Sequence, residues 1–229
     1  MLNLHEFPQR ETASIAAATC LAARLRSRLQ TDASANLVIS GGSTPVACFR
    51  ALAEITLDWE RVGIFLSDER WVDPEAAESN ERLARENLLT GIAAKARLHG
   101  VYAEGVSLEA RCAQIDQTIR GLPAGFAASL LGMGNDGHFA SLFPDAENLR
   151  QGLDLNNPAS CIPVSTAASD LPRVSLTLSA LARSDEILLL AFGREKRRVF
   201  EAAERSPDKY PVSSLLRLEQ PPVSIYWAP

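Results

Sequence analysis

The chain has 229 residues, of which 46% are hydrophobic and 22% are charged. This composition supplies one complete hydrophobic core and excludes an intrinsically disordered chain, so we expect one α/β domain over residues 1–229. The net charge of −5 gives no basic field, and a nucleic-acid partner is therefore not expected.

Residues 1–11 lack the apolar segment of a signal peptide, and no apolar run approaches the roughly 20 residues that cross a bilayer. We therefore expect a cytoplasmic protein without a membrane partner. The cysteines are scattered without a C-x-x-C pair, which favours buried free thiols over disulfides. They are Cys20, Cys48, Cys112 and Cys161.

Helical and strand patterns alternate along the whole chain. Apolar spacing and capping residues predict helices at 12–30, at a segment with Pro45 in its first turn, at 79–89, at 107–119 and at 194–205. Apolar runs predict strands at 37–39, 62–66, 97–102, 126–133, 186–192 and 223–227, with weaker candidates at 161–164 and 174–178. Residues 151–172 are polar and weakly patterned, and we expect a long surface excursion there.

The predicted strands are apolar throughout, which is typical of strands covered on both faces. Strands that alternate with helices form right-handed crossovers, so the fold class is α/β with a mostly parallel sheet. Ligands of such sheets bind outside the carboxyl ends of the strands. Polar clusters stand where four apolar runs stop, and we expect them to converge at one edge. They are residues 40–45, 67–72, 132–141 and 193–196.

The first cluster, residues 40–45, is a candidate phosphate cradle. Its two glycines, Gly41 and Gly42, allow close approach of the backbone to an anion, and Ser43 and Thr44 add hydroxyl donors. The following helix adds N–H groups and the positive end of its dipole. The alternative is a simple strand-to-helix turn. A nucleotide P-loop is disfavoured because no G-K-[ST] follows.

Three further cationic residues are candidates for binding an anion. Arg70 follows a buried strand, and its guanidinium suits an anionic or carbonyl oxygen, with Asp68 or Glu69 paired to other cations. A solvated loop is the alternative for this cluster. Lys196 begins the apolar stripe of its helix and is expected to point toward the shared crevice. Arg173 precedes a weaker strand.

The third cluster contains Gly132, Gly134 and Gly137, which match the dinucleotide pattern G-x-G-x-x-G. That function is disfavoured because the acidic residue expected about 20 positions later should end a strand, and Asp154 has no strand pattern around it. The alternative is acid/base chemistry. Histidine is the side chain best suited to proton transfer at neutral pH, so His138 is a candidate general base, with Asp136 orienting it or holding a water.

These clusters, in this order, resemble those of the 6-phosphogluconolactonase family. The resemblance covers nearly the whole chain and rests on Ser40–Pro45, Asp68–Arg70, Ser79-Asn80, Gly132–His138, Ala140–Pro144, Arg173 with Leu176-Thr177, and Gly193 with Lys196. It implies a Rossmann-like three-layer α/β/α fold, related to that of the glucosamine-6-phosphate deaminases.

The resemblance also implies a reaction, the hydrolysis of 6-phospho-D-glucono-1,5-lactone in the second step of the oxidative pentose phosphate pathway. His138 would activate water, and Asp136 and Arg70 would line the reacting end. The partner is a small phosphosugar lactone, and neither a metal nor a cofactor is implied. The sequence leaves monomer and homodimer both open. The phosphate would be held by Gly42, Ser43, Arg173 and Lys196.

Two alternatives and one departure remain. A deaminase-like sugar-phosphate isomerase needs a further carboxylate near the histidine, but by resemblance the relevant positions hold Arg70 and Phe143. An inactive sugar-phosphate binding module is disfavoured because a base is retained. The family more often has threonine where this chain has Phe139, a change that could alter loop packing or substrate access.

Overall fold

The computed structural model describes residues 2–167, 169–206 and 208–229. Its centre is a seven-stranded sheet in the order β1-β10-β9-β6-β2-β3-β5, and every neighbouring pair is parallel. The strands are β1 (Asn3–Glu6), β2 (Ala35–Ile39), β3 (Val62–Leu66), β5 (Arg97–His99), β6 (Ala128–Leu131), β9 (Ile187–Phe192) and β10 (Val223–Ala228).

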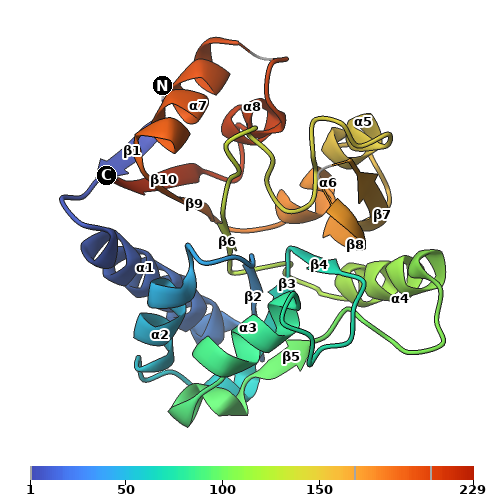
Figure 1. The fold of residues 1–229 in the computed structure, drawn as a ribbon. Coiled ribbons are helices and arrows are strands. Elements are labelled where there is room, and N and C mark those ends of the chain that lie inside the picture. The colour runs from blue at the N-terminus through green and yellow to red at the C-terminus, as the bar shows by residue number, and fades with distance from the viewer. Residues whose placement is uncertain (1, 168, 207) are drawn as a thin grey trace.

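Helices cover both faces of this sheet, which gives the three-layer arrangement seen in Figure 1. The helices α1, α2 and α3 lie on one side, while α4 to α8 lie on the other together with a small second sheet. The helices are α1 (Arg10–Thr31), α2 (Val46–Ala53), α3 (Asn80–Asn87), α4 (Leu108–Arg120), α5 (Leu149–Leu153), α6 (Leu178–Leu181), α7 (Arg194–Arg205) and α8 (Pro211–Leu216). Two 3-10 turns lie at Trp59–Arg61 and Gly91–Lys95.

Most predicted elements are confirmed, including the capping residues. Ser79 and Ser107 accept hydrogen bonds from backbone N–H groups in the first turns of α3 and α4. Pro45 is the residue immediately before α2 and not within its first turn. The predicted strands at 97–102 and 126–133 are shorter in the structure, and β1 and α8 were not predicted.

One prediction is wrong in an informative way. Residues 151–172 are not a plain surface excursion, because they include all of β7 (Cys161–Thr166) and the start of β8 (Ser169–Leu176). These strands do not join the parallel sheet. They form a second, antiparallel sheet in the order β4-β8-β7, in which β4 (Asp68–Arg70) was predicted as loop.

The site of interest is positioned by a reversal of chain direction at the centre of the main sheet. From β2 the chain runs outward through β3 to β5, and it then returns to the other side of β2 and continues through β6, β9 and β10. The crevice where the two directions diverge, outside the carboxyl ends of β2 and β6, is the place where open α/β sheets bind ligands.

All four cysteines are free thiols, as predicted. Cys48, Cys112 and Cys161 are buried, whereas Cys20 is only partly buried. Among the described helices, none combines the length and the apolar character that crossing a bilayer requires.

Replacing Leu189 with alanine tests the core. Leu189 is fully buried in β9, and removing its branched end leaves a cavity that should lower the free energy of unfolding by about 2–5 kcal/mol. Ile15→Ala is the matched control, because Ile15 is 50% exposed on α1 and should change stability by no more than about 0.5 kcal/mol. Urea denaturation measures both. If both variants lose the same free energy of unfolding, the burial of Leu189 in the core is contradicted.

Candidate functional site

A cavity of about 270 Å³ lies outside the carboxyl ends of the central strands. Loops that follow β2, β3, β6 and β9 contribute to its wall, so the four sequence clusters do converge. Seven of the eight predicted site residues line it: Gly42, Ser43, Thr44, Arg70, His138, Arg173 and Lys196. The eighth, Asp136, makes its contact through His138.

His138 is held by its own loop. Nδ1 of its ring lies 2.6 Å from Oδ1 of Asp136, and its backbone N–H donates to the same oxygen at 3.2 Å. A neutral imidazole in this contact carries its proton on Nδ1, because the carboxylate can only accept, and Nε2 remains available as a proton acceptor. Both contacts join Asp136 to His138 and restrict the orientation of the ring.

Glycine at position 134 is required by this pair. A Cβ there would lie 2.3 Å from the His138 ring and 2.4 Å from Oδ1 of Asp136. Gly137 adopts a left-handed φ of +79° and packs against Tyr210. The glycines that matched a dinucleotide pattern therefore serve the histidine loop, since two of them make room for its ring or its turn.

The Phe143 ring contacts two functional side chains. Its centroid lies 4.1 Å from that of His138, and Cζ of Arg173 lies 5.3 Å from it. Phe143 therefore gives the imidazole an apolar neighbour and the guanidinium an aromatic face. Phe139 is only 1% exposed and packs into the core. The residue after the histidine thus affects packing and does not form part of the cavity wall.

Arg70 is positioned by Asn80, a residue that the sequence analysis used only as part of a motif. Nη1 of Arg70 donates to Oδ1 of Asn80 at 3.2 Å and to the carbonyl of Glu78. The amide of Asn80 in turn donates to the carbonyl of Asp68 at 2.9 Å. Nε of Arg70 is buried without an acceptor among the described residues.

Gly41 and Gly42 differ in the reason for which glycine is needed. A Cβ on Gly41 would lie 1.8 Å from Oδ1 of Asn80, so its absence makes room for the side chain that holds Arg70. Gly42 has a φ of +85° and open space around it, which leaves its backbone exposed to the cavity. Only Gly42 fits the predicted role of close approach to an anion.

The acidic pair after β3 also divides into two roles. Glu69, which is 1% exposed, accepts hydrogen bonds from the backbone N–H groups of Arg70, Asn80 and Glu81 and from the Ser79 hydroxyl. Burial raises the pKa of Glu69, and these four donors act in the opposite direction. It fixes the start of α3 and does not pair with a cation.

Asp68 is the member of the pair that faces a cation. Its Oδ2 accepts from the Ser141 hydroxyl at 2.6 Å and lies 3.9 Å from Nη1 of Arg173. Burial lowers the pKa of Arg173, with Asp68 opposing that shift. Nε of Arg173, like that of Arg70, is buried without an acceptor among the described residues. The position of Arg173 on the cavity wall makes its guanidinium a second candidate contact for ligand oxygens.

Lys196 lies in the first turn of α7, on the side that faces the cavity, as predicted. Burial, followed by the charge of Arg10, lowers the pKa of Lys196. The cavity therefore has three cations on its wall, Arg70, Arg173 and Lys196, against the one carboxylate of Asp68. This local excess of positive charge contrasts with the net charge of −5 for the whole chain and favours an anionic ligand.

The parallel sheet with its switch-point crevice and the cationic cavity with an oriented histidine define a class. This is a Rossmann-like α/β enzyme with an anion-binding cleft.

Comparison with known proteins makes this class specific. Residues 8–227 match the family described as glucosamine-6-phosphate isomerases/6-phosphogluconolactonase. A 6-phosphogluconolactonase from Pseudomonas putida is 39% identical over 230 residues, covering 100% of this chain and 93% of that protein. A crystal structure of a 6-phosphogluconolactonase from Shewanella baltica OS155 superposes with a TM-score of 0.94 at 32% identity, covering 100% of this chain and 98% of the other.

The chain therefore belongs to the glucosamine-6-phosphate isomerase/6-phosphogluconolactonase family. A monomeric glucosamine-6-phosphate deaminase shares the fold at 17% identity with a TM-score of 0.76, covering 99% of this chain and 97% of the other. The Rossmann-like relationship expected from the sequence is thus confirmed.

Replacing Lys196 with methionine tests the charge that the cavity holds. A lysine whose pKa is lower in the folded chain than the ordinary 10.5 destabilises the fold while it is charged in both states, and this cost disappears as the pH rises through 10.5. Lys196→Met should therefore raise the Tm of the ligand-free protein at pH 7, with a smaller gain near pH 10.5. A gain of up to about 1 kcal/mol corresponds to about 2–4 °C.

The matched control is Lys95→Met. Lys95 is exposed and pairs with Glu60 at 2.8 Å, an ion pair that raises the pKa of this lysine, so its loss should not raise Tm. Calorimetry at the two pH values measures both variants. An unchanged or lower Tm for Lys196→Met at pH 7 would show that the lysine is not held at a cost.

Proposed function

We propose that this protein hydrolyses 6-phospho-D-glucono-1,5-lactone to 6-phospho-D-gluconate, in the second step of the oxidative pentose phosphate pathway. The observation that carries the proposal is the His138–Asp136 pair in a cavity lined by three cations. Family membership and the names of the similar proteins support the same reaction. We further propose that residues 1–229 act as one domain in the cytoplasm, on a small-molecule partner.

The phosphate of the substrate occupies the part of the cavity built by the loop after β2. The exposed backbone of Gly42 and the hydroxyls of Ser43 and Thr44 donate to its oxygens, while Lys196 and Arg173 neutralise its charge. Because the phosphate is remote from the reacting carbonyl, its binding energy orients C1 of the lactone beside His138.

The first chemical step adds water to the lactone carbonyl. Nε2 of His138 takes a proton from a water molecule as its oxygen forms a bond to C1, and Asp136 stabilises the resulting imidazolium. The electron pair of the carbonyl moves to its oxygen. The guanidinium of Arg70, on the cavity wall, stabilises that oxyanion, an interaction worth about 10²–10³-fold in rate.

The second step opens the ring. The oxyanion restores the carbonyl and the bond from C1 to the ring oxygen breaks. The imidazolium of His138 returns its proton to that oxygen, which becomes a hydroxyl group, and the neutral base is regenerated. A δ-lactone needs no strong nucleophile, so one histidine oriented by one carboxylate is sufficient.

The isomerase alternative is disfavoured by what surrounds the base. The side chain that stacks on the imidazole is Phe143, so this side of His138 is apolar and offers no second carboxylate for moving a proton between C1 and C2. The inactive binding module differs from a lactonase only in turnover, which the following experiment measures.

His138→Asn should lower kcat by about 10²–10⁴-fold and change KM little, because the base acts in the transition state and not in binding. His5→Asn is the matched control, since His5 lies in the edge strand β1 and stacks on Tyr226. Steady-state hydrolysis of freshly made phosphogluconolactone, corrected for spontaneous opening, measures both. Undiminished turnover in His138→Asn would exclude the histidine as base. If the wild type shows no turnover, the lactonase is excluded and the inactive binding module is the function that agrees with the result.

Arg173→Gln should raise KM for the phosphorylated lactone by about 10–100-fold, the value of a lost charge-assisted hydrogen bond. The same variant should hydrolyse phosphate-free D-glucono-1,5-lactone with unchanged kinetics. Arg198→Gln, on the exposed side of α7, is the control and should alter neither. If the kinetics on both lactones become worse to the same extent, Arg173 acts at the reacting end of the substrate and not at its phosphate.

A further inference from the structure

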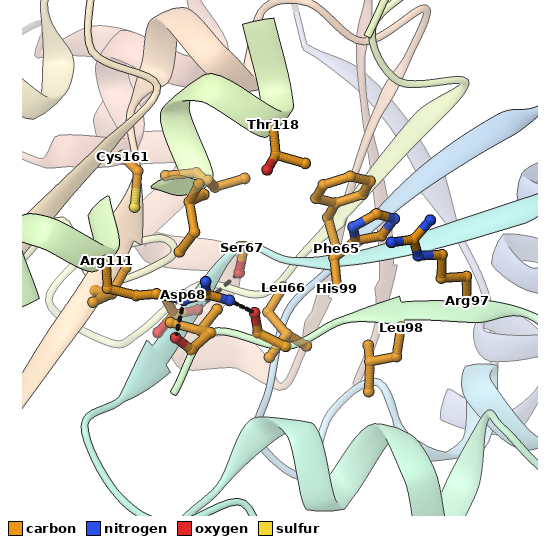
Figure 2. Close-up of a pocket in the computed structure, with 15 residues that line it drawn as sticks. Phe65, Leu66, Ser67, Asp68, Arg97, Leu98, His99, Arg111, Thr118 and Cys161 are labelled. Carbon is orange, nitrogen blue, oxygen red and sulfur yellow. Dashed lines mark hydrogen bonds between the residues drawn. The ribbon is translucent and has the colours of Figure 1, made fainter. Parts of the chain in front are cut away.

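A second cavity, larger than the catalytic one, lies on the other side of β8, and Figure 2 draws the residues that line it. Its volume is about 430 Å³, within the range of roughly 300–1,000 Å³ that is usual for small-molecule sites. The ends of β3 and β5 form one wall, α4 forms another, and β8 closes the side that faces the catalytic cavity. The reaction proposed above uses none of the side chains that only this cavity contains.

The walls of this cavity combine polar and apolar surface, and they include one aromatic face. Phe65 and His99 stack with their ring centroids 4.0 Å apart and their planes 10° from parallel, and Figure 2 shows the two rings together at one side of the cavity. Ile115, Val174 and Leu176 contribute aliphatic surface. Burial and the nearby charge of Arg97 lower the pKa of His99, so this ring is a neutral part of the wall near pH 7. Such walls suit a flat, apolar ring system.

Positive charge exceeds negative charge on the walls of this cavity. Arg111 donates to the carbonyls of Val101 and Gly100, both at 2.7 Å, and to the side chain of Gln114 at 2.8 Å, all of them neutral oxygens. Arg97 makes no hydrogen bond or ion pair within the described part of the chain, and its guanidinium lies beside His99. The cavity thus carries two arginines that no carboxylate neutralises.

The one carboxylate on these walls is already engaged. Asp68 accepts hydrogen bonds from the hydroxyls of Ser67 at 2.8 Å and Ser141 at 2.6 Å, and it faces Arg173 on the catalytic side. It therefore does not neutralise Arg97 or Arg111. A cationic excess beside an aromatic face is matched by a ligand that has both an aromatic ring and a negative charge.

The two cavities share a wall. Successive side chains of a strand point to opposite faces, and in β8 Arg173 faces the catalytic cavity while Val174 and Leu176 face the second one. Asp68 borders both. A ligand in the second cavity therefore packs against the back of the strand that carries a phosphate-binding arginine.

We propose that the second cavity is a binding site for a small aromatic anion, such as an aryl carboxylate or sulfonate, and that its occupancy is linked through β8 to anion binding in the catalytic cavity. The aromatic part lies on the Phe65–His99 face, and the anion lies toward Arg97 and Arg111. The linkage is reciprocal, because each ligand must change the affinity for the other by the same factor.

The binding experiment uses two fluorescent probes of similar shape, the anionic 1-anilinonaphthalene-8-sulfonate and the neutral N-phenyl-1-naphthylamine. The sulfonate should bind the folded protein at one site, and the neutral probe at least about 10-fold more weakly. Thr118→Trp fills the cavity from the exposed side of α4 and should weaken sulfonate binding by about 10-fold or more. Arg97→Gln should weaken it by about 3–10-fold.

Gln117→Trp is the matched control, because Gln117 is also exposed on α4 but does not line the cavity, and it should bind the sulfonate as the wild type does. The Tm of each variant verifies that it is folded. Sulfonate binding that is unaffected by Thr118→Trp, or equal affinity for the neutral probe, would overturn the assigned site or its preference for an anion.

The linkage is tested with inorganic phosphate, which requires the cationic catalytic cavity but not the proposed reaction. Saturating phosphate should shift the Kd of the sulfonate by about 3-fold or more in the wild type. The shift should vanish in Lys196→Met, which removes a phosphate ligand from the catalytic cavity and leaves the second cavity intact. The same Kd with and without phosphate in the wild type would overturn the linkage. A shift that persists in Lys196→Met would show that phosphate acts outside the catalytic cavity, which would also overturn it.

Discussion

The direct parallel pairing of β2 with β6 is the constraint on which the rest of the structure depends. Because the chain leaves this pair in opposite directions, the loops after the two strands cannot fold over the same neighbour, and a crevice opens between them. The loop after β2 brings exposed backbone and hydroxyl groups to one side, and the loop after β6 brings His138 to the other. The candidate phosphate cradle and His138 therefore face the same crevice from two different loops.

Around this crevice, cationic side chains are partly buried at a cost in free energy that an anionic ligand would reduce. Arg173 and Lys196 are both held where burial lowers their pKa, and the Nε atoms of Arg70 and Arg173 have no acceptor among the described residues. A ligand that brings negative charge and several acceptor oxygens removes both costs on binding. The specificity for a phosphorylated substrate proposed here follows from that compensation, in a chain whose overall charge is negative.

The second, antiparallel sheet is what divides this edge of the molecule into two cavities. Its central strand β8 presents Arg173 to the catalytic side and Val174 and Leu176 to the other, so one strand of eight residues forms a wall of both. The larger cavity has an aromatic face and two arginines that lack carboxylate partners among the described residues, whereas the smaller one has three cations and a histidine that contacts a carboxylate. This difference in lining is the physical basis for assigning them different ligands.

The sequence by itself determined six of the seven strands of the parallel sheet, five of the eight described helices and eight candidate site residues, seven of which line the cavity. These signals are local, since an apolar run, a capping serine or a glycine-rich strand end is contained within a few residues. Only the tertiary structure decided that Gly41 makes room for Asn80, that Glu69 anchors backbone while Asp68 faces Arg173, and that β4, β7 and β8 form a separate sheet. Each of those facts joins residues 10 or more positions apart, and which of them meet depends on packing that no local pattern encodes.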